Sequence, residues 1–258
     1  MKTVALFLIL FLVGGIGVLP AGVSDNLETL KVRFDKTPEV CIFDIDPEVS
    51  DSARTHEILT RLSVSSWSDA LFKEYPKGNW EIIVHDSISW KDHKDKAVED
   101  FPHCTIMVVF ESLSGSEALG TTSINFSNSN HKFMVIQVYV DYVNQNHIII
   151  DNGKADWAIE QVNEYTLQSV IIHELGHAFG LLHYINSSPI PKDMEGIEVS
   201  VMYPHLRINY GDIVEIKSPE LQMMGKLYGE YGWEGVKYPL VVKSCNFLQN
   251  IAYDCKYI

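Results

Sequence analysis

Basic residues are scarce in this chain of 258 residues. Lysine and arginine together number 20, against 34 aspartates and glutamates, so the formal net charge is −14. Binding to nucleic acid requires a basic surface that neutralises phosphates, and this balance therefore makes nucleic acid a poor candidate partner. Carboxylate clusters in such an acidic chain could hold calcium, so a requirement for Ca²⁺ stays open.

Long hydrophobic runs are also scarce, and the single example lies at the N-terminus. Lys2 is followed by an uncharged apolar run over residues 4–19 and then by small residues. This order is typical of a secretory signal peptide, here residues 1–24, with an uncleaved membrane anchor as the alternative. We expect the mature chain to be secreted, to leave the membrane once the signal peptide is cleaved, and to be a monomer.

Cysteine is sparse, and none of the four cysteines has the CxxC spacing of a zinc site. In an exported protein the four are more typical of disulfides, for which three pairings are possible. The short loop between Cys245 and Cys255 favours that pair and leaves Cys41 to pair with Cys104.

The chain has no internal repeat and no low-complexity tract, and its hydrophobic pattern indicates one α+β fold. Apolar periodicity predicts helices over residues 51–75, 162–182 and 219–228, with Asn163 as a cap of the second. Runs rich in β-branched and aromatic residues predict strands over residues 40–46, 79–86, 104–111, 121–126 and 133–141. This order predicts a twisted mixed β-sheet packed by two long helices.

The sequence HELGHAFGLLH begins at His173 and carries the strongest chemical signal. On a helix, His173 and His177 lie one above the other, whereas Glu174 is rotated by about 100° and can reach a water molecule beside a shared metal. Gly180 is suited to end the helix, which lets the chain turn His183 towards the same point. Three neutral imidazoles that leave one coordination position of the metal open are typical ligands of a catalytic zinc ion.

The alternative is a core helix that contains histidines by chance. Matching five fixed positions has a chance frequency of about one in ten thousand chains of this length, taking ~1/20 per residue. Buried imidazoles also need polar partners, so three on one stripe are unusual in a core. The pattern therefore favours a metal site in which Glu174 is the general base for hydrolysis of a peptide bond.

HExxHxxGxxH followed by a methionine turn resembles the signature of the metzincin metallopeptidases. The turn is SVMYP, with Met202 as its methionine, and the MYP sequence looks most like the matrixin branch. The resemblance extends over residues 40–231. It implies a zincin-like fold, with a cleft between an upper lobe that ends near residue 180 and a smaller irregular lower lobe with a C-terminal helix.

The resemblance also implies roles for individual residues. His173, His177 and His183 would bind one zinc ion, Glu174 would be the general base, and Met202 would pack beneath the metal. The resemblance places Tyr203 and Pro204 in the pocket for the residue after the scissile bond. The implied domain order is a linker or short pro-segment over residues 25–38, a catalytic domain over 39–240 and a tail over 241–258.

Together these observations predict a secreted zinc endopeptidase that acts on a polypeptide substrate. One rival is a non-catalytic zinc-binding or adhesion module that keeps the same fold, and another is a metal-dependent hydrolase of non-protein substrates. Glu174 argues against the first, because metal binding alone requires no base. The polar strand over residues 121–126 could bind a substrate backbone as an added strand. The remaining histidines are expected to be surface or hydrogen-bonded residues rather than ligands: His56, His85, His93, His103, His131, His147 and His205.

Overall fold

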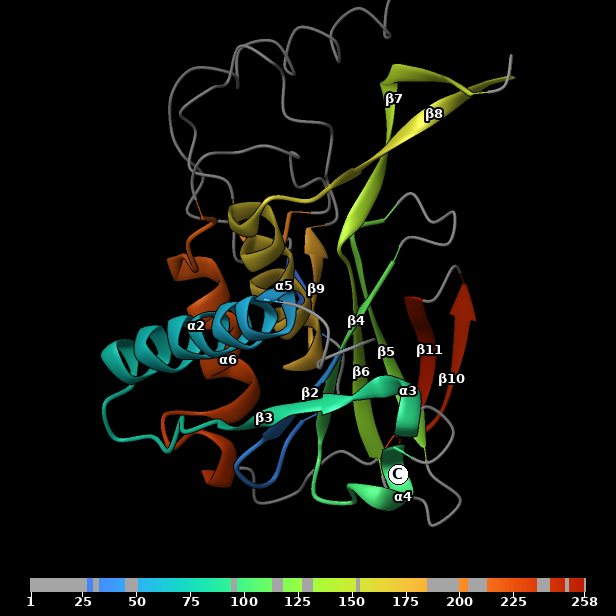
Figure 1. Ribbon diagram of the computed structural model, residues 1–258. Coiled ribbons are helices and arrows are strands. Elements are labelled where there is room, and N and C mark those ends of the chain that lie inside the picture. The colour runs from blue at the N-terminus through green and yellow to red at the C-terminus, as the bar shows by residue number, and fades with distance from the viewer. Residues whose placement is uncertain are drawn as a thin grey trace, which may run out of the picture.

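A five-stranded mixed sheet forms the centre of the molecule (Figure 1). The computed structural model describes residues 27–29, 33–44, 51–93, 97–112, 118–126, 132–151, 154–184, 200–203, 213–235, 242–248 and 251–257. In spatial order the strands of the sheet are β3 (Ile83–Ser89), β2 (Glu39–Asp44), β4 (Ile106–Glu111), β6 (Lys132–Tyr139) and β5 (Gly120–Phe126). The first four are parallel, and β5 pairs antiparallel to β6 at the end of the sheet. The predicted mixed sheet is therefore confirmed.

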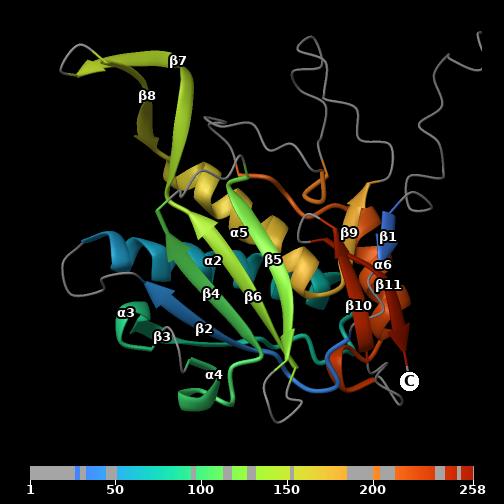
Figure 2. The same ribbon diagram turned by 90° about the vertical axis from the view of Figure 1, so that its right-hand side faces the viewer.

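The two long helices cover one face of this sheet, as Figure 2 shows. They are α2 (Asp51–Glu74) and α5 (Glu164–Ala178), and they pack against each other. The indole Nε1 of Trp67 donates a hydrogen bond of 2.9 Å to the carbonyl oxygen of Ile172, which ties the middle of α2 to the middle of α5. Because both helices bury apolar side chains against the sheet, α5 is fixed over β5 and β6.

The opposite face carries a smaller apolar cluster that includes the disulfide between Cys41 and Cys104. The short helices α3 (Trp90–His93) and α4 (Ala97–Asp100) lie on this side (Figure 1). The predicted pairing of Cys41 with Cys104 is confirmed. The second predicted pair, Cys245 with Cys255, concerns side chains outside the described part of the chain.

Three two-stranded pairings lie outside the central sheet, and the sequence predicted none of them. Their strands are β1 (Leu27–Thr29) with β9 (Leu181–Tyr184), β7 (Asp141–Asp151) with β8 (Lys154–Gln161), and β10 (Val242–Leu248) with β11 (Ile251–Tyr257). The β7–β8 hairpin extends away from the body of the molecule (Figure 1). The β1–β9 pair places part of the predicted linker beside the strand that carries His183.

Helix α6 (Ser218–Tyr228) lies late in the described part of the chain and is followed by the 3-10 turn η2 (Trp233–Gly235). The predicted C-terminal helix is thereby confirmed. Trp233 of η2 is fully buried and stacks edge-on against Tyr228, whose hydroxyl donates to the carbonyl oxygen of Phe179 at the end of α5. The last helix is thus anchored to the end of the histidine-bearing helix.

Several predicted boundaries differ from the observed ones, with the two largest shifts at the end of α5 and the start of β3. The helix predicted over residues 162–182 ends at Ala178, because Gly180 adopts φ 102°, a conformation that starts β9. The strand predicted from residue 79 begins at Ile83, because Asn79 makes its backbone hydrogen bonds with Tyr231 and Trp233 instead. Among the described residues no helix is long and apolar enough to cross a membrane, and the predicted signal peptide lies outside them.

Candidate metal centre

Helix α5 is positioned by its cap and by its burial. The side chain of Asn163 accepts a hydrogen bond of 2.8 Å from the backbone N–H of Thr166, which confirms the predicted cap. Most of the helix beyond that first turn is buried, including His173 and Glu174 at 5% exposure each. Both side chains are therefore almost fully shielded from water.

Three imidazoles converge at the end of this helix. His173 and His177 come from α5, and His183 comes from β9 after the turn at Gly180. The Nε2 atoms of the three rings lie 3.0 Å (His173 to His183), 3.1 Å (His173 to His177) and 3.1 Å (His177 to His183) apart. The structure thus brings together all three histidines of the predicted ligand set.

The other ring nitrogen fixes the tautomer of two of these histidines. Nδ1 of His173 donates to the carbonyl oxygen of Val201 at 2.6 Å, and Nδ1 of His177 donates to that of Leu181 at 2.7 Å. A carbonyl oxygen has no proton, so in a neutral ring the proton is on Nδ1 and Nε2 carries a bare lone pair. The 3.1 Å contact between the two Nε2 atoms therefore holds no hydrogen bond, and a cation would relieve the lone-pair repulsion.

Burial keeps these rings in the neutral form that binds metals. Burial lowers the pKa of His173 to about 4, helped by the neighbouring His183 and opposed by the hydrogen bond to Val201. The pKa of His177 is also well below its usual range, again mainly through burial and then through the two other histidines. The residues fit a metal ion: one nitrogen of each of the three rings lies within 4.8 Å of those of the other two, and main-chain carbonyls orient His173 and His177.

Glu174 lies against strand β5. The Thr122 hydroxyl donates to Oε2 of Glu174 at 2.6 Å, and this hydrogen bond partly offsets the burial that raises the pKa of the carboxyl to about 7. Gly120, two residues earlier, lets the strand approach this closely: a Cβ there would lie 2.6 Å from Val170 and 2.9 Å from Oε1 of Glu174. A cation beside the carboxyl would favour its ionised form.

Thr122 and Gly120 were not predicted from the sequence. The strand that carries them was predicted, but its contact with Glu174 depends on the position of α5 over the edge of the sheet. Without that packing, a threonine in a polar strand carries no signal that it contacts a carboxylate.

Met202 packs against α5 near the C-terminal end of the helix, at Gly176. It is fully buried, and its sulfur is so close to Gly176 that a Cβ at that position would overlap it. The turn is held by Ser200, whose hydroxyl donates to Glu220 of α6 and accepts from the backbone N–H of Met202 at 3.1 Å. Because Val201 in the same turn accepts the hydrogen bond from His173, the turn supports the histidine cluster directly.

Two further predicted site residues, Tyr203 and Pro204, belong to the same SVMYP turn. Tyr203 is half-buried, and Pro204 lies outside the described part of the chain.

Neither a scan against models of known protein families nor a search of the curated proteins finds a match for this chain.

Proposed function

We propose that this protein is a secreted zinc-dependent endopeptidase of the metzincin type. The observation that carries the proposal is the convergence of three Nε2 atoms at 3.0–3.1 Å, two of them shown by their Nδ1 hydrogen bonds to be lone-pair donors. A buried carboxylate, Glu174, follows the first of these histidines in the sequence. Three protein ligands leave a position for a reactant, which distinguishes a catalytic from a closed structural zinc site.

The histidines, Glu174 and Thr122 would each have a separate role in the hydrolysis of a peptide bond. A zinc ion bound by His173, His177 and His183 would polarise the substrate carbonyl and acidify a water molecule. Glu174 would accept the proton of the attacking water and then pass it to the departing amine. Thr122 would orient the carboxylate through its 2.6 Å hydrogen bond.

Strand β5 supports a polypeptide as the substrate. It is the last strand of the sheet, and its Thr122 contacts Glu174, so an extended chain lying along it would pass the reacting groups. A substrate bound in this way would present its backbone at each position, which suits an endopeptidase better than a hydrolase of small molecules. Tyr203, half-buried in the methionine turn, would then contact the residue after the scissile bond.

The test is an assay of the purified protein on an unfolded protein substrate, with and without a zinc chelator. We expect cleavage that the chelator abolishes and added Zn²⁺ restores. Glu174→Ala should lower the rate by about a hundredfold to ten-thousandfold without loss of bound metal, the range expected for a general base. Glu164→Gln, a matched change at an exposed position of the same helix, should leave the rate unchanged.

Two results would contradict the proposal. Cleavage that persists in the Glu174→Ala protein would remove the general base from the mechanism. A wild-type protein that binds zinc but cleaves no peptide bond would favour the rival function, a non-catalytic zinc-binding or adhesion module.

A further inference from the structure

A second group of ligand-type side chains lies on the face of the sheet that α2 and α5 leave uncovered. Glu39 opens β2, His85 lies in β3, and His103 lies in the turn before β4. Oε2 of Glu39 is 2.9 Å from Nε2 of His85, and the ring centroids of His85 and His103 are 4.6 Å apart. One ligand atom from each of the three lies within 4.8 Å of those of the other two.

The backbone beneath Glu39 and His103 is held rigidly. The N–H of Glu39 donates to Oγ1 of Thr105 at 2.8 Å, and the N–H of Thr105 donates back to the carbonyl oxygen of Glu39 at 2.9 Å. The disulfide between Cys41 and Cys104 joins the same two segments, directly beside His103. The start of β2 and the turn that presents His103 are therefore held together by hydrogen bonds and by a disulfide.

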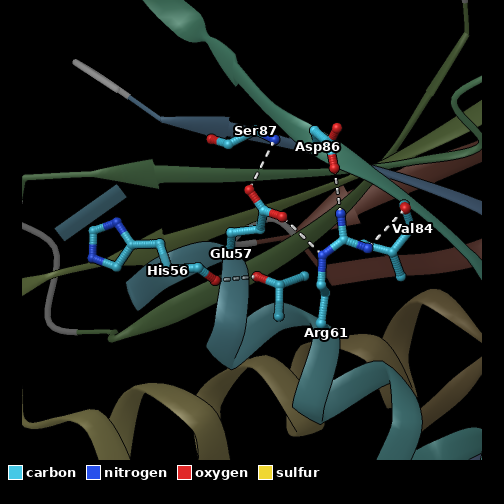
Figure 3. Close-up of polar contacts among 7 residues, drawn as sticks. His56, Glu57, Arg61, Val84, Asp86 and Ser87 are labelled. Carbon is cyan, nitrogen blue, oxygen red and sulfur yellow. Dashed lines mark hydrogen bonds and ion pairs between the residues drawn. The ribbon is translucent and has the colours of Figure 1, made fainter. Parts of the chain in front are cut away.

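An arginine of α2 contacts the residues on either side of His85, as Figure 3 shows. Arg61 donates to the carbonyl oxygen of Val84 at 3.0 Å and to the carboxylate of Asp86 at 2.7 Å. The register between β2 and β3 also shifts here, because Val40 pairs with Val84 whereas Ile42 pairs with Ser87. The extra residue in β3 is a bulge, a feature that re-aims a side chain, and His85 lies within it.

We propose that Glu39, His85 and His103 bind a second divalent transition-metal ion, with Zn²⁺ as the best-suited metal. Two imidazoles and one carboxylate are a recurrent ligand set for such ions, and the remaining positions would be filled by water. The ion would tie together the starts of three neighbouring parallel strands, β2, β3 and β4. His103 is exposed, so its ring can turn to close the distances to the other two ligands without moving the backbone.

The simpler alternative is an ion pair between Glu39 and His85 in which His103 has no part. That pair explains the 2.9 Å contact, but not the edge of a second imidazole brought against His85 by a turn fixed through a disulfide. The two readings differ in how many metal ions the folded protein holds and in what His103 contributes.

The test is the number of zinc ions that the full-length protein keeps after dialysis, measured by elemental analysis. We expect two per chain in the wild type and one in His103→Ala. Glu39→Gln, which keeps the shape of the side chain, should weaken the second equivalent by about tenfold or more, since even indirect supports of a metal site are worth that much. His93→Ala is the matched control, because His93 pairs with Asp100 and contributes no ligand to the cluster; it should keep two.

A double variant of the first centre separates this inference from the proposed function. His177→Ala with His183→Ala should keep one zinc ion, and adding His103→Ala to it should leave none. A double variant that holds no zinc ion, or a His103→Ala protein that holds as many as the wild type, would overturn the second site, and circular dichroism would show that each variant is folded. Peptidase activity plays no part in these measurements, so failure of the proposed function would leave them interpretable.

Discussion

The two histidine clusters of this chain are built in opposite ways. His173, His177 and His183 come from one helix and the strand that follows it, main-chain carbonyls hold two of the rings, and His173 and Glu174 are buried. Glu39 and His85 come from neighbouring strands, and their side chains remain 24% and 34% exposed. Pre-orientation in a dry site suits chemistry, because the groups need not reorganise during the reaction. Exposed ligands on strand ends suit a structural ion instead.

Removing one ligand of the buried cluster should produce the largest effect. In His183→Ala two imidazoles remain on α5, and we expect zinc affinity at this centre and peptidase activity to fall by more than about a hundredfold. The measurement is activity together with bound zinc, beside His93→Ala as an unrelated histidine. If the His183→Ala protein kept full activity, the buried cluster would not be the reactive one.

Removing the hydrogen bond to Glu174 should have a smaller effect on activity. Thr122→Val keeps the shape of the side chain but leaves the carboxylate without its 2.6 Å donor. We expect kcat to fall by about tenfold to a hundredfold, because a hydrogen bond to a charged group contributes about 1.5–3 kcal/mol. KM and bound zinc should stay unchanged, since Thr122 would act through Glu174 alone.

Two further variants define that role. Thr122→Ser keeps the hydroxyl and should restore most of the lost rate. Thr121→Val removes the neighbouring hydroxyl, which donates to Gln137 instead, and should have no effect. A fall in kcat that serine does not rescue would indicate a packing defect rather than a role in positioning Glu174.

The contrast between the clusters also explains what the sequence can predict. The spacing of His173, His177, Gly180 and His183 is local, so helical periodicity and one glycine turn suffice to bring the rings together. Glu39, His85 and His103 meet only because β2, β3 and β4 are neighbours, and strand order depends on packing across the whole sheet. For the same reason His85 and His103 were expected to be ordinary surface or hydrogen-bonded residues.

The fold follows the same division. Buried strands such as β2 and β4 were predicted because their runs rich in β-branched and aromatic residues are typical of strands. The β7–β8 hairpin was not predicted, because several of its large apolar side chains face solvent: Ile150, Trp157 and Ile159 are all exposed. Their pattern carries no signal of an inward face, and the two strands pair with each other rather than with the central sheet.

The glycine that separates α5 from β9 should matter moderately for stability. Gly180 has φ 102°, where an added Cβ is strained, so Gly180→Ala should lower the free energy of unfolding by about 1–2 kcal/mol. The same change should weaken zinc binding by displacing His183. Denaturant unfolding of the zinc-free protein measures the first effect separately. Gly180→Asn is the control, because asparagine tolerates positive φ better than alanine and should lose less.

The smallest effect is expected at Arg61, which supports the exposed cluster as Val201 and Leu181 support the buried one. Arg61→Met keeps the apolar stem of the side chain but removes the donors to Val84 and Asp86 shown in Figure 3. Because the contact with Asp86 is solvent-exposed, the loss of stability should be about 1 kcal/mol or less. Zinc affinity at the exposed cluster should fall by less than about tenfold, with peptidase activity unchanged, since Arg61 orients β3 rather than a ligand. An equal loss at both clusters, measured by zinc titration, would instead mean that Arg61 stabilises the fold as a whole.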